Sequence, residues 1–294
     1  MNYQWYPGHM TKAKRMMEEN IKLIDIVIEL VDARIPLSSK NPDIDELAKN
    51  KYRLILLNKS DLADDKITNQ WINYFNENNI YCLKLNSRNN SGIKQVNGLI
   101  MTACADKIER NKQRGILNRP IRAMVVGIPN VGKSTFINSY AGKASAKTGN
   151  KPGVTKGKQW IKLNKNVELL DTPGILWPKF DNQEVGKRLA MIGSMNDEIL
   201  NVEELAIDTI KYIYSEYSDN VIERYGLDKE KTAASYDENA INPDNSVALY
   251  IMEQAAVKRG CIKKGNNIDY EKISNIILDD FRSGRLGRIS LETP

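Results

Sequence analysis

The residues with the clearest chemistry form a glycine-rich segment that follows an apolar, β-branched run at 121–126. Residues 127–135 read GIPNVGKST, which is the pattern GxxxxGK[ST]. Glycines in such a loop let backbone N–H groups surround phosphate oxygens at the amino end of a helix. Lys133 is expected to reach the β and γ phosphates, and the Ser134 hydroxyl is expected to ligate Mg²⁺. The predicted phosphate-contacting residues are Asn130, Val131, Gly132, Lys133, Ser134 and Thr135.

A second strand pattern, at 167–170, is followed by the residues DTPG at 171–174. Asp171 can support the Mg²⁺ shell, and the N–H of Gly174 can contact the γ phosphate. DxxG is a common turn by itself, but some 36 residues after a phosphate loop it indicates a nucleotide site. Thr155, in the intervening segment KPGVT, is predicted to be a second Mg²⁺ ligand, although neighbouring hydroxyl residues are alternatives.

The choice of base is predicted upstream, where the apolar run 53–57 ends in NKSD at 58–61. The Asp61 carboxylate can accept hydrogen bonds from both guanine N1–H and the 2-amino group, which adenine cannot offer. Asn58 is expected to brace the loop, and the stem of Lys59 to pack on the base plane. Asn and Asp also favour capped turns, but with a phosphate loop in the same chain the pattern predicts guanine. The backbone of Ser87, after another strand pattern, is a candidate contact for guanine O6.

These segments need a scaffold that brings the ends of several strands together. Strand patterns at 26–31, 53–57, 80–85, 121–126, 159–163 and 167–170 alternate with helical patterns near 11–23, 43–50, 64–78, 92–112 and 133–141. Alternation of this kind predicts an α/β fold with a mostly parallel sheet covered on both faces. Ligands of such sheets bind at the carboxyl ends of the strands. After residue 178 the strand patterns stop, and helical spacing at 184–193, 203–217, 245–259 and 269–282 predicts a second, all-α domain over 179–294.

Composition and charge limit the class of protein. Three widely spaced cysteines, Cys82, Cys104 and Cys261, argue for a reducing compartment and against a disulfide framework. No apolar run approaches the roughly 20 residues of a membrane span, so we expect a cytoplasmic protein. We also expect a monomer. Residues 1–174 hold 28 Lys and Arg against 16 Asp and Glu, whereas residues 175–294 hold 15 against 21. The basic half is consistent with a polyanionic partner, or with a solvated surface that keeps the protein soluble.

The order of the motifs, with NKSD before GIPNVGKST and DTPG, resembles that of the circularly permuted GTPases. Residues 5–15 (WYPGHMTKAKR), 31–36 (VDARIP) and 281–288 (FRSGRLGR) closely resemble the ribosome biogenesis GTPase A (YlqF) family, so that the likeness covers nearly the whole chain. This resemblance implies a circularly permuted P-loop domain over 1–178 and a helical RNA-binding domain over 179–294. It also implies GTP hydrolysis coupled to a late step in assembly of the large ribosomal subunit, with rRNA and ribosomal proteins as partners.

Two other classes of function remain open. One is a nucleotide-gated RNA-binding regulator in which hydrolysis is incidental. The other is an enzyme in which the GTP-binding domain regulates a second chemistry, although residues 179–294 offer no histidine, nucleophilic cysteine or metal cluster for it. In the permuted order the chain passes from DTPG into the helical domain within a few residues. A rearrangement that depends on the γ phosphate would therefore act directly on the second domain.

The residue that orients the attacking water in many GTPases is replaced in this sequence. Many GTPases place a glutamine after DxxG to orient water, but here that residue is Ile175. His9, the one histidine of the chain, lies in the segment PGHM, and the family resemblance implies a role for it in hydrolysis; a hydrogen-bonded structural histidine is the alternative. Asn130 occupies the position at which similar GTPases coordinate K⁺, although asparagine is also a common turn residue.

Replacing His9 by alanine tests the first role. We expect His9→Ala to retain its affinity for GTP and to lose turnover in the presence of the activating partner, because only the positioning of water or a proton is removed. Nucleotide titration and stimulated phosphate release measure the two quantities separately. Unchanged stimulated turnover would exclude the catalytic role.

Exchange of monovalent cations tests the second role. If K⁺ bound by Asn130 stabilises the charge of the transition state, hydrolysis should slow when K⁺ is replaced by Na⁺ at equal ionic strength. The measurement is the rate of phosphate release in the two salts. Equal rates would show that no K⁺-selective site contributes.

Overall fold

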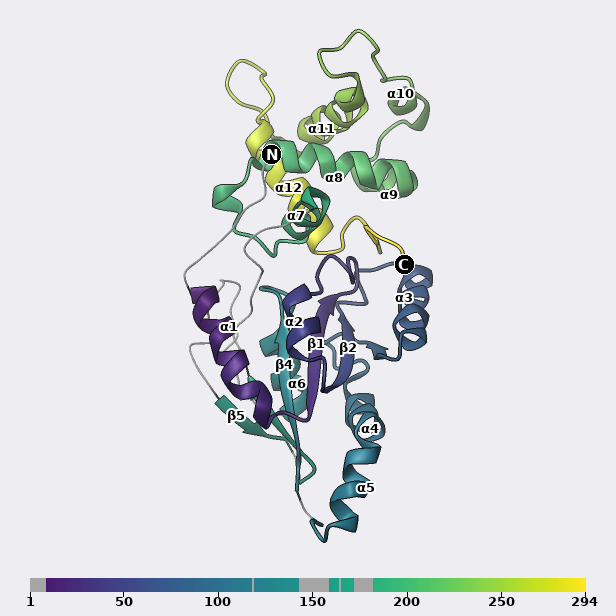
Figure 1. Cartoon of the computed structure of the whole chain (residues 1–294). Coiled ribbons are helices and arrows are strands. Elements are labelled where there is room, and N and C mark those ends of the chain that lie inside the picture. The colour runs from purple at the N-terminus through teal and green to yellow at the C-terminus, as the bar shows by residue number, and fades with distance from the viewer. Residues whose placement is uncertain (1–8, 118, 143–158, 164, 172–181) are drawn as a thin grey trace. The chain divides into compact units, whose positions relative to one another are not determined.

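The computed structural model describes residues 9–117, 119–142, 159–163, 165–171 and 182–294 (Figure 1). They form two compact units. The sheet unit comprises the described residues up to Gly186 together with Glu292–Pro294, and the helical unit comprises Lys187–Leu291. The domain boundary predicted between 178 and 179 lies outside the described residues.

One six-stranded sheet forms the centre of the sheet unit, with the order β3-β2-β1-β4-β6-β5. Its strands are β1 (Ile26–Asp32), β2 (Tyr52–Asn58), β3 (Tyr81–Lys84), β4 (Ile121–Gly127), β5 (Gln159–Lys162) and β6 (Val167–Asp171). All neighbouring pairs are parallel except β5 with β6. The predicted α/β fold with a mostly parallel sheet is therefore confirmed.

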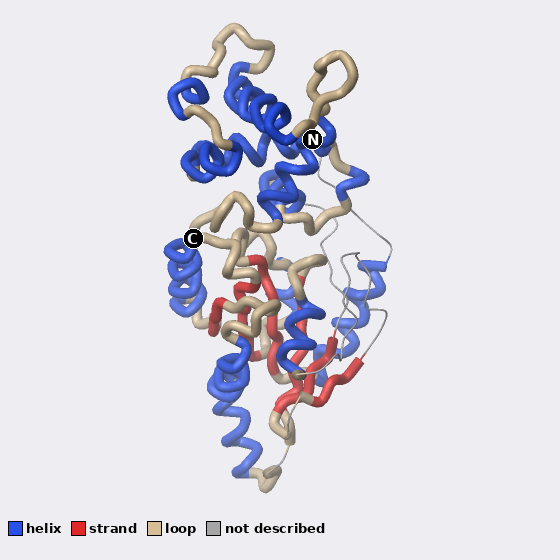
Figure 2. Tube along the Cα trace, turned by 180° about the vertical axis from the view of Figure 1, so that it is seen from behind, coloured by secondary structure: helices blue, strands red, loops and turns tan. Residues whose placement is uncertain are grey.

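Helices cover both faces of this sheet (Figures 1 and 2). Successive strand residues point to opposite faces, so Val27 and Val31 of β1 lie on the same side. Val27 packs in a cluster with Met17 of α1 (His9–Asn20) and Ile44 of α2 (Pro42–Leu47). Val31 packs in a cluster with Trp71 of α3 (Asp65–Glu77). On the other face, α4 (Ile93–Ala103) contacts β2, and α6 (Lys133–Ala141) contacts β4 and α4.

One predicted helix is divided in the structure. The helical pattern at 92–112 becomes α4 and α5 (Ala105–Gln113), because the backbone leaves helical geometry at Cys104 (φ −100°, ψ 13°). A buried cysteine carries no sequence feature that ends a helix, so the pattern alone did not indicate this break.

The helical unit confirms the all-α prediction and adds two helices. Its helices are α7 (Gln183–Met191, which begins in the sheet unit), α8 (Val202–Glu216), α9 (Ser218–Tyr225), α10 (Lys229–Ala233), α11 (Ser246–Arg259) and α12 (Tyr270–Arg282). The sequence patterns did not predict α9 and α10. Only Tyr217 separates α8 from α9, without Gly or Pro, and α10 is a single short turn. None of the described helices is long and apolar enough to cross a membrane.

Candidate nucleotide-binding site

The phosphate loop connects β4 to α6 at the carboxyl edge of the sheet. Asn130 and Gly132 both have a left-handed backbone, with φ of 59° and 92°. A Cβ atom added to Gly132 would lie 2.5 Å from Nδ2 of Asn58, so only glycine fits beside that side chain. Lys133 is buried in the first turn of α6, where the amino end of the helix favours an anion. The loop has the geometry expected of a phosphate cradle.

The side chain of Asn58 joins three of the predicted motifs. Its Nδ2 donates to the carbonyl oxygen of Val131 in the phosphate loop, at 2.7 Å. Its Oδ1 accepts from the backbone N–H of Ser87 at 3.1 Å and from the Ser87 hydroxyl at 2.9 Å. All three residues are buried. The predicted base loop, the phosphate loop and the segment after β3 therefore meet at one amide group.

Ser87 has a different contact from the one expected. Its N–H group was the predicted donor to guanine O6, but in the structure it donates to Asn58. Its carbonyl oxygen accepts from the Ser139 hydroxyl of α6 at 2.7 Å. Ser87 thus links the base loop to α6 and serves as a brace for Asn58.

A buried ion cluster lies beside the base loop, and the sequence analysis did not identify it. Asp32, the last residue of β1, is fully buried and accepts from Arg34 Nε and Nη2, both at 2.9 Å. The Nζ of Lys59 lies 3.0 Å from the same carboxylate. Burial alone would raise the pKa of Asp32, but the charges of Arg34 and Lys59 outweigh it and hold this pKa well below its ordinary range. Lys59 is therefore anchored by its ammonium group. The segment VDAR, at the end of a buried strand, is the sequence feature that could have revealed the cluster.

The last residues of the chain contribute to the same region. The Glu292 carboxylate accepts from the backbone N–H of Ser38 at 2.9 Å, and also from the N–H of Leu37 and the hydroxyl of Ser38. The carbonyl oxygen of Glu292 accepts from Trp71 Nε1 at 3.2 Å. These contacts hold the loop that contains Arg34. No local pattern near Glu292 indicates such a role, because its partners are more than 200 residues away.

The other predicted residues are described only in part. Asp61 is exposed in the loop after β2. Asp171 ends β6 and pairs in register with Val125 of β4, so its backbone lies beside the strand that leads to the phosphate loop. Its side chain, and that of His9 at the start of α1, are outside the described atoms, as are the whole of Thr155 and Gly174.

Of the three predicted Mg²⁺ ligands, Ser134 is the one whose side chain the structure describes. Ser134 is half-buried and is the second residue of α6, which places a hydroxyl group at the phosphate loop. An oxygen donor at this point fits the preference of Mg²⁺ for oxygen ligands. No group of three or more His, Cys, Asp or Glu that could hold a metal occurs among the described residues.

Comparison with known proteins gives full-length matches. Residues 122–236 match a family model described as 50S ribosome-binding GTPase. The chain is 47% identical to ribosome biogenesis GTPase A of Bacillus cereus over 294 residues, covering 100% of this chain and 95% of that protein. It is 31% identical to ribosome biogenesis GTPase A of Thermotoga maritima over 290 residues, with 99% and 94% covered.

Solved structures give matching folds. The GDP-bound structure of YlqF matches with a TM-score of 0.64 and 25% identity, covering 95% of this chain and 98% of that one. The GNP-bound structure of YlqF from T. maritima matches with a TM-score of 0.61 and 26% identity, covering 96% and 98%. The NKSD segment precedes the region matched by the family model, in agreement with a permuted motif order.

Removal of the Glu292 carboxylate should destabilise the sheet unit. In Glu292→Ala the N–H groups of Leu37 and Ser38 lose their acceptor, which should lower the free energy of unfolding by about 1–3 kcal/mol. Urea denaturation followed by tryptophan fluorescence measures this change. The exposed Glu77→Ala on α3 is the control, and an equal effect of the two substitutions would contradict the role of Glu292.

Proposed function

The chain belongs to the ribosome biogenesis GTPase A family, and we propose from this membership that it acts on the immature large ribosomal subunit. GTP hydrolysis in ribosome assembly is the activity of the family. The finer proposal is that hydrolysis is coupled to a late step of assembly. The observation that carries the nucleotide part is the amide of Asn58, which brings the phosphate loop and the base loop together.

The roles of the site residues follow from this arrangement. Asp61 accepts from guanine N1–H and the 2-amino group, and Lys59 packs its stem on the base while Asp32 holds its ammonium group. Asn58 and Ser87 brace the base loop. The phosphates are bound by the segment Asn130, Val131, Gly132, Lys133, Ser134 and Thr135, with the N–H of Gly174 at the γ phosphate.

Mg²⁺ is the general cofactor of GTPases, and its proposed ligands here are Ser134, Thr155 and Asp171. Mg²⁺ held by these residues would supply positive charge that offsets the negative charge of the phosphates. Lys133 stabilises the same phosphates from the protein side. Because Ile175 cannot orient water, we assign the positioning of the nucleophilic water to His9. A K⁺ ion, if held by Asn130, would supply the positive charge that an arginine finger supplies in other GTPases.

We propose that the helical unit contacts rRNA. Some of its basic side chains, however, are paired with groups of the unit itself. Arg282 donates to Asp197 and to the carbonyl oxygens of Ala190 and Met191, and Arg285 is paired with Asp280. These two arginines therefore stabilise the unit itself. The exposed cations near the end of α11, Arg259 and Lys264, are better placed for an external partner.

Stimulation of GTP hydrolysis by large ribosomal subunits distinguishes an assembly factor from a nucleotide-gated RNA-binding regulator. Purified large ribosomal subunits, and assembly intermediates of them, should raise the rate of GTP hydrolysis by roughly 10-fold or more, since a partner that completes a GTPase site gives large accelerations. Phosphate release with and without subunits measures this. Lys133→Ala is the control and should hydrolyse slowly in both conditions. An unchanged rate for the unmodified chain would favour the regulator.

A further inference from the structure

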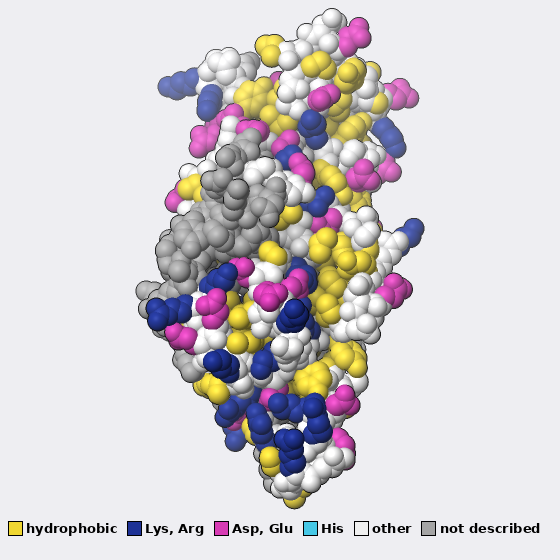
Figure 3. All heavy atoms as spheres, in the orientation of Figure 1, with side chains coloured by type: hydrophobic (Ala, Val, Ile, Leu, Met, Phe, Trp, Pro, Cys, Tyr) yellow, Lys and Arg dark blue, Asp and Glu magenta, His cyan; other side chains and the backbone are white. Residues whose placement is uncertain are grey.

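Basic side chains gather at the edge of the sheet where the strands begin, opposite the nucleotide edge. Lys51 immediately precedes β2, Arg119 and Arg122 flank the start of β4, and Lys165 lies just before β6. Residues 105–122, which include α5, hold six Lys and Arg against two Asp and Glu. In the space-filling view, dark blue side chains cluster around this end of the sheet unit (Figure 3).

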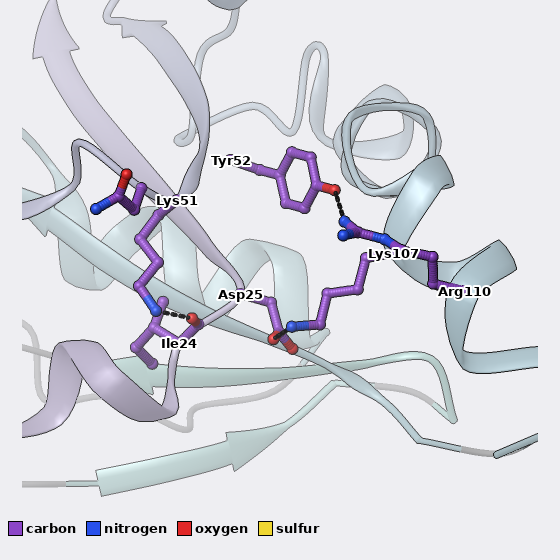
Figure 4. A pocket seen from close by; sticks show the side chains of 7 residues that line it. Ile24, Asp25, Lys51, Tyr52, Lys107 and Arg110 are labelled. Carbon is purple, nitrogen blue, oxygen red and sulfur yellow. Dashed lines mark hydrogen bonds and ion pairs between the residues drawn. The ribbon is translucent and has the colours of Figure 1, made fainter. Parts of the chain in front are cut away.

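A pocket of about 300 Å³ opens at this edge (Figure 4). Its walls come from the segment before β1, the start of β2, and one side of α5. The lining residues are Ile24, Asp25, Asn50, Lys51, Tyr52, Lys107 and Arg110. Three cations from two separate elements therefore converge on a single cavity.

The one carboxylate of the pocket is already neutralised. Asp25 lies 2.6 Å from Lys107 Nζ and 3.5 Å from Arg119, and it accepts from the backbone N–H of Arg122 at 3.0 Å. Its side chain is almost fully buried. The closest charged partners of Asp25 are thus Lys107 and Arg119.

In the described part of the chain, Lys51 and Arg110 hydrogen-bond only to uncharged groups. Lys51 Nζ donates to the carbonyl oxygen of Ile24 at 2.8 Å. Arg110 donates to the Tyr52 hydroxyl at 3.1 Å and to the carbonyl oxygen of Asp106 at 3.2 Å. Burial, and then the like charge of Lys107, lower the pKa of Lys51, and the carboxylate of Asp25 offsets this only in part. An anion in the pocket would relieve this crowding of positive charge.

We propose that this pocket binds a phosphate of an RNA backbone, and that further phosphates follow the basic residues of α5. Arg110 lies on α5, and Arg114, which is exposed, caps the end of the same helix four residues later. A guanidinium group and an ammonium group are the donors that phosphate contacts use. The inference rests on the proposed function, because it supplies an RNA contact of the GTP-binding unit. Its position at the opposite edge leaves the nucleotide site open.

Charge-removing substitutions test the site. The double variant Lys51→Gln, Arg110→Gln should bind a fluorescein-labelled RNA hairpin roughly 10-fold more weakly, with the slope of log affinity against log salt reduced by about two. The single variant Arg110→Gln, on an exposed helix, should lose about one unit of slope. Lys66→Gln on α3 is the matched control. Melting temperatures show that each variant is folded.

Two outcomes would overturn the proposal, and a third bears only on the proposed function. Unchanged affinity and slope in both variants, as in Lys66→Gln, would exclude RNA binding by the pocket. Unchanged RNA affinity with weakened binding to large ribosomal subunits would assign this surface to an acidic protein instead. Subunits that fail to stimulate GTP hydrolysis by the unmodified chain would refute the proposed function, whereas the hairpin titration, which uses no subunit, would still decide the pocket.

Discussion

The side-chain amide of Asn58 holds together loops that leave three different strands. Asn58 is the last residue of β2, and its amide forms hydrogen bonds with Val131 after β4 and with Ser87 after β3. Both ends of the amide are buried and satisfied, so loss of either partner would leave a polar atom without a hydrogen bond. Gly132 is required because a Cβ atom at this position would collide with this amide. The predicted base loop and phosphate loop are thus joined by one side-chain amide.

A parallel sheet makes this meeting of loops possible. Because β1, β2, β3, β4 and β6 run in the same direction, the loops that follow them emerge at one edge. The register aligns Asp32 with Asn58, and Val125 with Asp171. Circular permutation changes which loop comes first in the chain but not where the strands end. The geometry therefore survives the altered motif order.

At both the carboxyl edge and the amino edge of the sheet, a buried carboxylate is paired with two cations. Asp32 at the carboxyl edge is paired with Arg34 and Lys59, and Asp25 at the amino edge is paired with Lys107 and Arg119. A buried carboxylate without such partners would be costly. The amino edge differs because Lys51 and Arg110 also line its pocket and hydrogen-bond only to uncharged groups, which suits this edge to an external anion.

By itself, the sequence determined the type of sheet, the position of the phosphate loop and the preference for guanine. Apolar strand patterns, glycine spacing and NKSD are local, and their physical meaning does not depend on distant residues. Only the tertiary structure decided how they are held. The partners of Asn58 are 29 and 73 residues away, and those of Glu292 more than 200. Such contacts depend on strand order and on the return of the chain end, which local patterns do not encode. The same reason applies to the basic pocket, whose cations come from segments that meet only after the sheet has formed.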